Sequence, residues 1–410
     1  MNVKSNNMDF PLEPIQPEDV GFSSERLGIL REIFSREVEA QRIPGCVIGI
    51  ARAGKLAWLE AIGQRQPNAG EAMTTDTIFS VASMTKLMTS VIIMQLFEEG
   101  RLMLGDPVGT HLPVLARLQV AEFTPDGGLE NRTAARQPTI QDLLRHTSGL
   151  TYKNRGTTSA HALYPESSTS ASQSLTKSEF LKILSGCPLL FDPGAKWEYG
   201  FSTDVLGFII EAITGNSLGE EMNKRIWTPL GMSDTSFELP GSKAQRYAHA
   251  FDRDPLSGVP QSAPHLPDGK RLWEGGGGGA LSTAPDYLKF LAMMSGLGTS
   301  GETRLLGRKT VELMTADHLG PETVNQIADT MDLAAAGYGF GLGVAVRRSD
   351  GISAMPGTEG DYYWSGVFGT YFWVDPYEEL SVVMMAAAPG ETRLRQRQLV
   401  RAGVYQAIAD

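Results

Sequence analysis

The chain has 410 residues, of which 41% are hydrophobic and 20% charged, and its formal net charge is −11. This composition is that of a globular protein with a large core, and the negative charge argues against nucleic acid or an anionic membrane as a partner. No apolar run approaches the roughly 20 residues that a membrane-spanning helix needs. The first twenty residues also lack the apolar segment of a secretory signal, so from the sequence we expect a cytoplasmic protein.

In chain order the sequence predicts a helix, two paired strands, a second helix, a long and mainly helical segment, three strands and a final helix. Apolar residues at helical spacing indicate the helices, and short runs rich in β-branched and aromatic residues indicate the strands. The first helix begins at Ser23 or Ser24, either of which can cap it. The predicted bounds are 24–38 for this helix, 46–51 and 56–62 for the strand pair, 83–100 for the second helix, 338–346, 362–374 and 380–386 for the later strands, and 391–408 for the last helix.

Strands near both ends of the chain, with helices between them, imply one sheet that is built from both terminal segments. We therefore predict the α+β class, with a central antiparallel sheet flanked by helices and an inserted helical lobe. Residues 1–100 and 281–410 are expected to form the first lobe, and residues 101–280 the mainly helical one. The active site is expected where the two lobes meet, and the loop 149–176 and the segment 249–273 are expected to border its pocket.

The segment Ser83-Met84-Thr85-Lys86 stands at the head of the apolar stretch 87–97. Positions i and i+3 share a face of a helix, so the serine hydroxyl and the lysine amine would lie within hydrogen-bond reach. A lysine between apolar neighbours has a lowered pKa and can take the proton of a serine nucleophile. This pattern predicts a serine hydrolase that needs no histidine. The alternative is an ordinary helix start, with the lysine in solvent.

The same spacing recurs at Ser174 and Lys177, within a polar segment that is rich in serine and threonine. Thr176, followed three residues later by Glu179, has the pattern of a capping box. This second occurrence therefore predicts the start of a helix and no chemistry.

Two further segments supply groups that complement a serine nucleophile. Tyr199 follows a Pro-Gly turn and precedes an apolar run, and a phenol on such a loop can point into a cleft and exchange protons with a lysine. Gly366 interrupts an aromatic strand, where a backbone N–H can approach a substrate and donate to an oxyanion. The alternatives are a packing tyrosine and an ordinary core strand.

In this order and at these separations, the three segments resemble the serine β-lactamase and penicillin-binding-protein superfamily. The resemblance is closest to the class C β-lactamase-like esterases, called family VIII carboxylesterases, and covers roughly residues 15–405. Supporting stretches are Leu143 to Leu150 and Gly275 to Gly279. The resemblance implies a β-lactamase-like fold.

The resemblance also implies roles for individual residues. Ser83 would be the nucleophile, and Lys86 and Tyr199 would be the general base and proton shuttle. Which of the two takes the first proton stays open. The backbone N–H groups of Ser83 and Val367 would form the oxyanion hole.

Two departures from the β-lactamase pattern bear on the substrate. Trp364-Ser365-Gly366 stands where β-lactamases have Lys-Thr-Gly, which binds a substrate carboxylate. Phe201 stands where they have an asparagine after the tyrosine. An apolar pocket does not select polar anionic substrates, so both changes predict a carboxylesterase that acts on neutral, short- to medium-chain acyl esters. Trp364, Ser365, Gly366, Phe201 and Trp273 are the predicted substrate-binding residues.

Other functions remain as alternatives. β-Lactamase, D,D-peptidase or D-aminopeptidase activity would use the same nucleophile, and an acyltransferase would replace water by another acceptor. A catalytically inactive binding protein is disfavoured by the intact set of Ser83, Lys86 and Tyr199. An α/β-hydrolase is disfavoured because the chain contains no Gly-x-Ser-x-Gly segment.

The sequence suggests no cofactor and no metal. It contains no His-Glu-x-x-His, and Gly275 to Gly279 lacks the Lys-Ser or Lys-Thr of a phosphate-binding loop. Cys46 and Cys187 have the pattern of buried hydrophobic residues, with a nucleophilic Cys187 as the alternative. The only expected partner is a small-molecule ester, and a homo-oligomer stays open as an alternative to a monomer.

Overall fold

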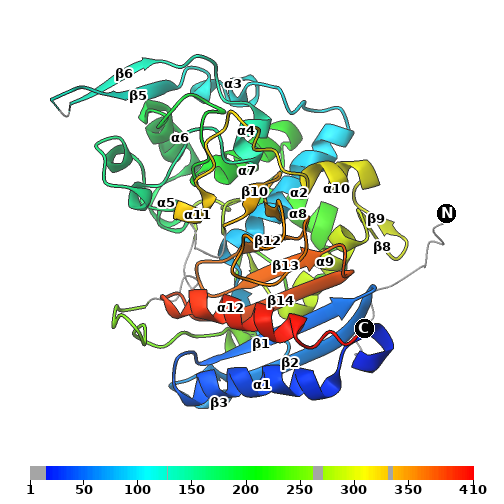
Figure 1. Cartoon of the computed structure of the whole chain (residues 1–410). Helices are drawn as coiled ribbons and strands as arrows, with labels where there is room; N and C mark the ends of the chain where they lie inside the picture. The colour runs from blue at the N-terminus through cyan, green and yellow to red at the C-terminus, as the bar shows by residue number, and fades with distance from the viewer. Residues whose placement is uncertain (1–14, 127, 262–270, 331–335) are drawn as a thin grey trace.

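The structure is a computed structural model that describes residues 15–126, 128–261, 271–330 and 336–410. An eight-stranded antiparallel sheet forms its centre (Figure 1). The N-terminal and C-terminal strands meet where β1 pairs with β14, so both ends of the chain build this sheet, as the sequence predicts. In spatial order the strands are β10 (Tyr338–Phe340), β11 (Ala345–Arg347), β12 (Tyr362–Ser365), β13 (Tyr371–Asp375), β14 (Leu380–Ala386), β1 (Gly45–Arg52), β2 (Lys55–Gln66) and β3 (Glu71–Ala72).

Helices cover both faces of the sheet. On one face, α1 (Ser24–Glu39) packs beside α12 (Thr392–Tyr405) (Figure 1). On the other face, α9 (Ala284–Ser295) packs against β1 and β14. The cap of α1 is Ser23, whose hydroxyl accepts a hydrogen bond from the backbone of Arg26, as the sequence predicts. Gly403 allows α12 to lie close to α1, because a Cβ at this position would lie 2.5 Å from the Leu30 side chain.

Two of the predicted strands are wrong, because each is a hairpin of two short strands. The segment 338–346 turns at Gly343, with φ 106°, and the segment 362–374 turns at Gly369, with φ 110°. Glycine adopts this left-handed backbone at little cost, which allows the chain to reverse. The apolar pattern continues through both turns, so periodicity alone did not reveal them.

The remaining elements lie between the two sets of sheet strands. Most elements of the middle segment are helices, but it also contains the hairpin β5–β6, whose residues are largely exposed and give no apolar strand signal. The long central helix α2 begins at Thr85, two residues later than predicted, after a 3-10 turn. The helices and strands between the two sets of sheet strands are α2 (Thr85–Glu98), α3 (Val108–His111), α4 (Ile140–Leu144), α5 (Ser168–Ser174), α6 (Lys177–Gly186), α7 (Ser202–Thr214), α8 (Leu218–Met222), α10 (Arg308–Met314), α11 (Ile327–Thr330), β4 (Phe79–Ser80), β5 (Gln119–Phe123), β6 (Leu129–Thr133), β7 (Leu281–Ser282), β8 (Thr299–Ser300) and β9 (Thr303–Arg304).

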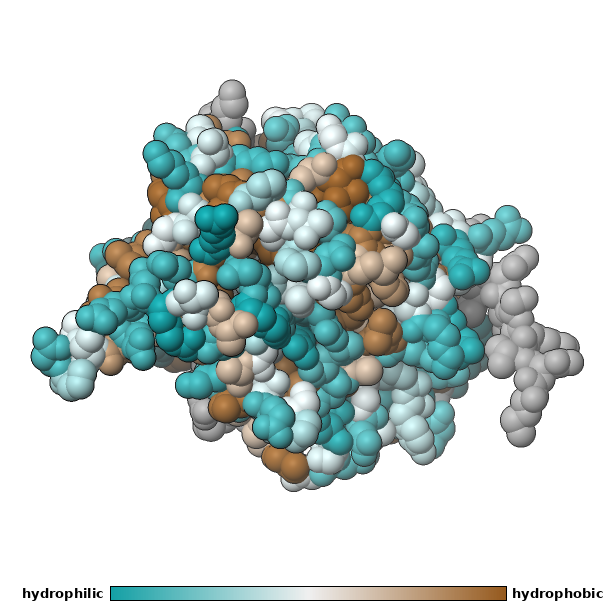
Figure 2. All heavy atoms as spheres, turned by 90° about the horizontal axis from the view of Figure 1, so that it is seen from above, coloured by the Kyte–Doolittle hydropathy of each residue, from teal (hydrophilic) through white to brown (hydrophobic). Residues whose placement is uncertain are grey.

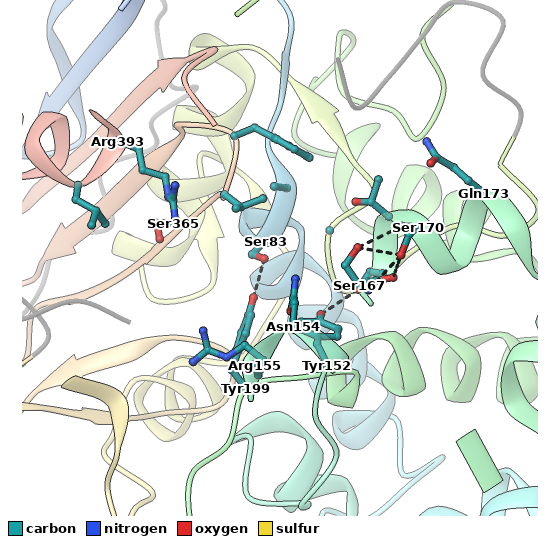
Figure 3. A pocket seen from close by; sticks show the side chains of 18 of the residues that line it. Ser83, Tyr152, Asn154, Arg155, Ser167, Ser170, Gln173, Tyr199, Ser365 and Arg393 are labelled. Carbon is teal, nitrogen blue, oxygen red and sulfur yellow. Dashed lines mark hydrogen bonds between the residues drawn. The ribbon is translucent and has the colours of Figure 1, made fainter. Parts of the chain in front are cut away.

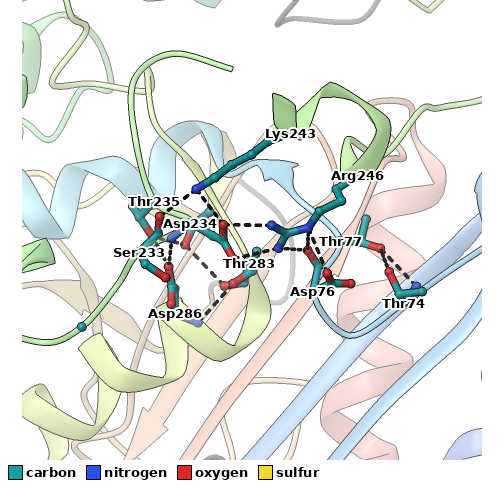
Figure 4. A network of polar contacts seen from close by, with 12 residues as sticks. Thr74, Asp76, Thr77, Ser233, Asp234, Thr235, Lys243, Arg246, Thr283 and Asp286 are labelled. Carbon is teal, nitrogen blue, oxygen red and sulfur yellow. Dashed lines mark hydrogen bonds and ion pairs between the residues drawn. The ribbon is translucent and has the colours of Figure 1, made fainter. Parts of the chain in front are cut away.

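A network of charged side chains fixes the segment that leads to β4 (Figure 4). Asp234 pairs with Lys243 at 2.8 Å and with Arg246 at 2.7 Å, and Arg246 also pairs with Asp76 at 2.9 Å. The backbone carbonyl of Arg246 accepts a hydrogen bond from the N–H of Ile78, next to β4. Hydrogen bonding from Arg246 lowers the pKa of Asp234 to about 2, so this carboxylate stays charged at neutral pH.

A second polar cluster is buried beside the sheet and ties α12 to its C-terminal strands. Asp361 accepts hydrogen bonds from Arg347 Nε at 2.6 Å, from the Tyr338 hydroxyl at 2.7 Å and from Arg401. All four side chains are buried. Each charge in this cluster therefore depends on the others for compensation.

Asp361→Ala is expected to lower the free energy of unfolding by about 3–5 kcal/mol, because it leaves the buried Arg347 and Arg401 without their carboxylate. Urea denaturation of the two proteins measures this difference. Asp350→Ala, which alters an exposed carboxylate near the same strands, is the control and should change stability by at most about 0.5 kcal/mol. A similar small change for Asp361→Ala would contradict this account of the cluster.

The face of the molecule seen in Figure 2 is mainly hydrophilic, with apolar side chains in scattered groups. Among the described residues, no helix is both long enough and apolar enough to cross a membrane.

Candidate active site

Ser83 lies in a tight turn between β4 and α2. The turn spans Ala82–Met84 and is a single 3-10 turn. Ala82 has φ 46°, a left-handed conformation that costs a residue with a Cβ about 1–3 kcal/mol and is typical of functional sites. The hydroxyl of Thr85 donates to the Ala82 carbonyl at 2.7 Å and holds this backbone in place. The turn presents the Ser83 side chain to a cavity.

The three side chains that the sequence predicts as catalytic meet at the Ser83 hydroxyl. Lys86 Nζ lies 3.2 Å from Ser83 Oγ, and the hydroxyl of Tyr199 donates to the same oxygen at 2.6 Å (Figure 3). Lys86 is fully buried, and its amine lies 4.6 Å from the centre of the Tyr199 ring. The serine proton therefore has two possible acceptors within direct reach.

The glycine-rich run holds the lysine. Lys86 Nζ donates to the backbone carbonyl of Gly277, and the N–H of Gly277 donates to Asp204 Oδ1 at 3.0 Å. A Cβ at position 277 would lie 2.5 Å from the Asp204 carboxylate, so this close approach requires glycine. Asp204 is thus connected to the lysine through one peptide group.

Asp204 is a residue of the site that sequence reasoning missed. Its carboxylate is buried on α7 and accepts a hydrogen bond from the Ser168 hydroxyl at 2.6 Å, which in turn shares one of 2.9 Å with the Tyr152 hydroxyl. Burial raises the pKa of Asp204, and the positive charge of Lys86 opposes that shift. The available signal was a charged residue in the apolar run of α7, but nothing in the sequence indicated its neighbours.

Asp204→Asn is expected to lower kcat/KM for an ester by about 10- to 100-fold and to move the acid limb of the pH–rate profile to lower pH. The amide keeps the shape of the side chain but does not titrate, so the loss of rate that protonation of Asp204 causes in wild type, where burial raises the pKa of this carboxyl, is absent from the variant. The measurement is kcat/KM against pH.

Glu221→Gln is the matched control, because Glu221 is a buried carboxylate outside the site that pairs with Arg225. The acid limb of the pH–rate profile of Glu221→Gln should stay at the pH of the wild-type limb. A uniform loss of rate in Asp204→Asn without any shift of the limb would mean that Asp204 is only structural.

The turn after β12 borders the nucleophile. The N–H of Gly366 donates to the Thr370 carbonyl at 2.8 Å, and a Cβ at this glycine would lie 2.5 Å from the carbonyl of Val81. Glycine therefore allows this turn to lie against the segment that carries Ser83. Val367 follows in the turn, and both Val367 and Ser83 line the cavity.

The cavity beside Ser83 has a volume of about 490 Å³, and both polar and apolar groups line it (Figure 3). Of the predicted site residues, Ser83, Tyr199, Ser365 and Val367 line it. The expectation that loop 149–176 borders the pocket is confirmed. Of the segment 249–273, residues 262–270 lie outside the described residues, and none of the others lines the cavity. The remaining lining residues are Ala82, Tyr152, Asn154, Arg155, Ser167, Ser168, Thr169, Ser170, Gln173, Gly277, Gly278, Phe368, Arg393, Leu394 and Arg397.

The large aromatic residues predicted to bind substrate lie behind this lining, as does the backbone of Gly366. The ring centre of Trp364 is 5.5 Å from that of Tyr199, and the ring centre of Phe201 is 4.5 Å from that of Tyr152. Trp273 donates its indole N–H to the Leu175 carbonyl at 3.1 Å. In this structure these three side chains support the residues of the wall and do not form its surface, so the wall is more polar than the sequence suggested.

His146 is a further buried neighbour of Tyr199. Its ring centre lies 4.9 Å from that of the tyrosine, and neither of its ring nitrogens has a hydrogen-bond partner among the described residues. Burial lowers its pKa well below the ordinary value, and the charges of Lys86 and Arg155 add to this effect. The imidazole is therefore neutral at neutral pH and packs as a flat, apolar support for Tyr199.

Both cysteines are buried. Burial raises the pKa of Cys187 to about 12 and also raises that of Cys46. At neutral pH both remain thiols, so the alternative of a Cys187 nucleophile is disfavoured. The described part of the chain holds no group of three side chains placed to bind a metal ion.

The second occurrence of the Ser-x-x-Lys spacing is structural, as predicted. Ser174 ends α5 and Lys177 begins α6, so the two do not share a helix. Thr176 caps α6 through the predicted capping box with Glu179. The amine of Lys177 pairs with Glu211.

Comparisons with known proteins identify the family of this chain. A family model described as "Beta-lactamase" matches residues 30–405. Esterase EstB of Burkholderia gladioli is 29% identical over 381 residues, which cover 87% of this chain and 89% of EstB. The monacolin J acid methylbutanoyltransferase of Aspergillus terreus is 30% identical over 353 residues, 82% of each chain.

A solved structure shows the same fold. EstCE1, described as a hydrolase with promiscuous acyltransferase activity, has a TM-score of 0.73 to this chain at 26% identity. The match covers 93% of this chain and 99% of EstCE1. The family model spans most of the chain and the fold agrees with it, so the chain belongs to the β-lactamase family and is a serine hydrolase of the β-lactamase fold.

Proposed function

We propose that the protein is a serine carboxylesterase that hydrolyses short- to medium-chain acyl esters through an acyl-enzyme on Ser83. The observation that carries the proposal is the position of Ser83 Oγ, 3.2 Å from Lys86 Nζ and 2.6 Å from the Tyr199 hydroxyl, at the edge of an open cavity. A cavity of about 490 Å³ lies within the usual range for small-molecule sites.

In the first half of the reaction, Ser83 Oγ attacks the ester carbonyl while its proton passes to Lys86 or Tyr199. The backbone N–H groups of Ser83 and Val367 are the proposed donors to the oxyanion that forms. Collapse of the tetrahedral intermediate breaks the ester C–O bond, and Tyr199 donates a proton to the departing alkoxide. The products of this step are the free alcohol and the acyl ester of Ser83.

In the second half, water replaces the alcohol. Tyr199 or Lys86 accepts one proton from the water as its oxygen attacks the acyl carbonyl, and this proton passes to Ser83 Oγ as the bond between Oγ and the acyl carbon breaks and the acid leaves. The same two groups therefore act as acid and base in alternate steps, and no cofactor is needed to balance the reaction.

Two observations favour esters over β-lactams. Trp364 replaces the lysine of the β-lactamase motif, and its side chain is buried against Tyr199. Relatives that span almost the whole chain are named as an esterase and as a hydrolase. β-Lactamase, D,D-peptidase and D-aminopeptidase activities are therefore ranked lower.

Acyl transfer is a second candidate. The methylbutanoyltransferase at 30% identity and the promiscuous transfer activity in the description of EstCE1 favour it. In that case an alcohol or amine would enter the cavity in place of water and would receive the acyl group from Ser83.

The test is a comparison of kcat/KM for 4-nitrophenyl esters from acetate to caprylate with that for nitrocefin, with and without an added alcohol. Ester turnover orders of magnitude above nitrocefin turnover is expected. Nitrocefin turnover equal to that of the best ester would overturn the assignment. Transfer of most of the acyl group to the added alcohol would favour the transferase.

A further inference from the structure

A continuous chain of hydrogen bonds connects the buried lysine to the wall of the cavity. Lys86 Nζ donates to the Gly277 carbonyl, and the Gly277 N–H donates to Asp204 Oδ1 at 3.0 Å. The other oxygen of this carboxylate, Oδ2, accepts a hydrogen bond of 2.6 Å from the Ser168 hydroxyl. Ser168 shares a further hydrogen bond of 2.9 Å with the Tyr152 hydroxyl, and both residues line the cavity (Figure 3). The contacts thus join α2, the glycine-rich run, α7 and α5.

The direction of each of these hydrogen bonds follows from the number of protons available. An ionised carboxylate only accepts, and a serine hydroxyl has a single proton to donate. Because Ser168 donates this proton to Asp204, the Tyr152 hydroxyl is the donor to Ser168 Oγ. A proton on Asp204 would oppose a hydrogen that is already there, from the Gly277 N–H at Oδ1 or from Ser168 at Oδ2. This arrangement therefore requires an ionised Asp204.

Asp204 depends on these donors because its carboxylate is buried. Burial raises its pKa, whereas the charge of Lys86 and the hydrogen bonds from Ser168 and Gly277 lower it. The titratable groups that face it are Lys86, from α2, and Tyr152, from the segment before α5. Burial raises the pKa of the Tyr152 hydroxyl well above its ordinary value, so this group stays neutral. In the described part of the chain, Ser168 supplies the one side-chain hydrogen bond to this carboxylate.

We propose that Ser168, with Tyr152 behind it, is a positioning residue for the reaction at Ser83. Its hydroxyl keeps the Asp204 carboxylate ionised and turned toward Gly277, whose peptide group in turn holds the Lys86 amine beside the nucleophile. The inference rests on the proposed function, in which Lys86 takes part in proton transfer, and it adds the residues that keep this lysine in place.

The helix that carries Ser168 does not need this hydroxyl in order to begin. Ser168 is the first residue of α5, but the cap of the helix is Ser167, whose side chain accepts a hydrogen bond from the Ser170 N–H. Ser167 and Ser170 form a reciprocal capping box. Loss of the Ser168 hydroxyl is therefore expected to change the chemistry of the site and to leave the start of α5 intact.

The test measures kcat/KM for 4-nitrophenyl butyrate against pH in wild type and in Ser168→Ala. The variant lacks a hydrogen bond that favours the ionised carboxylate, so the pKa of Asp204 rises and the acid limb should move to higher pH by about one unit. This direction is opposite to that expected for Asp204→Asn. Ser168→Thr keeps a hydroxyl and should have its limb near that of wild type.

Further variants separate this role from a structural one. When Ser168→Ala is combined with Asp204→Asn, the limb should equal that of Asp204→Asn alone, because no titrating carboxyl is left for the serine to act on. Tyr152→Phe should move the limb in the same direction as Ser168→Ala, but less, because Ser168 keeps its own proton. The matched control is Ser172→Ala, which alters a buried serine of the same helix whose hydroxyl donates to the Thr169 carbonyl at 3.0 Å. Its limb should coincide with that of wild type.

An acid limb that Ser168→Ala leaves at the wild-type pH, or shifts equally in the presence of Asp204→Asn, would overturn this inference and leave the proposed esterase function standing. If wild type hydrolyses no ester, the proposed function fails, and the rate of Ser83 phosphonylation by a 4-nitrophenyl alkylphosphonate, measured against pH, gives the same comparison. If Ser83 is not phosphonylated either, the nucleophile is wrong and this inference fails with it.

Discussion

Ser83→Ala is expected to lower kcat for 4-nitrophenyl butyrate by up to about 10⁶-fold, the loss measured when a serine hydrolase loses its nucleophile. Without Oγ no acyl-enzyme forms, and the lysine and tyrosine have no serine proton to accept. Initial rates of the purified proteins measure the effect, with thermal unfolding as a check that both are folded.

The chain supplies its own control for this experiment. Ser174 has the same spacing to a lysine as Ser83, but it lies at the end of α5, with its hydroxyl donating to the Ser170 carbonyl at 2.7 Å. Ser174→Ala should keep the full rate. Activity of Ser83→Ala near that of wild type would show that another residue is the nucleophile.

Lys86→Met is expected to lower kcat by at least about 10³-fold while leaving the protein folded. Residues that act as one catalytic unit each cost nearly as much as the whole unit when removed. Methionine has a similar length and no charge, so it fits the buried position without the cost of burying an amine, and the stability should be unchanged or higher. The two readouts are the steady-state rate and the midpoint of urea denaturation.

Lys177→Met is the matched control, because Lys177 has the same spacing to a serine but pairs with Glu211 on α7. Its rate should equal that of wild type. If Lys86→Met keeps most of its activity, Tyr199 alone can take the serine proton and the role proposed for the lysine is wrong.

The placement of Ser83 next to Lys86 could be predicted from the sequence because it depends on local geometry. A spacing of three residues at the head of a helix brings the two side chains together whatever surrounds them, and the structure gives a distance of 3.2 Å. Tyr199 could be predicted only through the resemblance to a family, since 116 positions separate it from the serine it contacts.

The supporting residues could not be predicted, because their contacts join distant segments. Asp204 meets Gly277 and Arg397 meets Gly366 only once the chain has folded. The sequence also does not indicate on which face of β12 the Trp364 side chain lies. All four residues of β12 are buried, so the strand lacks the alternation of polar and apolar residues that tells one face from the other.

The hairpins at Gly343 and Gly369 were missed for a related reason. Both turns lie within long apolar runs, and the residues on either side of each turn are buried. Each turn contains two glycines, which favour a turn, but no proline, asparagine or aspartate that would have marked it more clearly.

The central claim is that Ser83 forms a covalent acyl-enzyme, and covalent labelling with a 4-nitrophenyl alkylphosphonate tests it most directly. Phosphonylation should add one label per chain, which peptide mass spectrometry should place on Ser83. Ser83→Ala should remain unlabelled, and Lys86→Met should react much more slowly. A label on a different residue, or no label from an enzyme that still hydrolyses esters, would contradict the account.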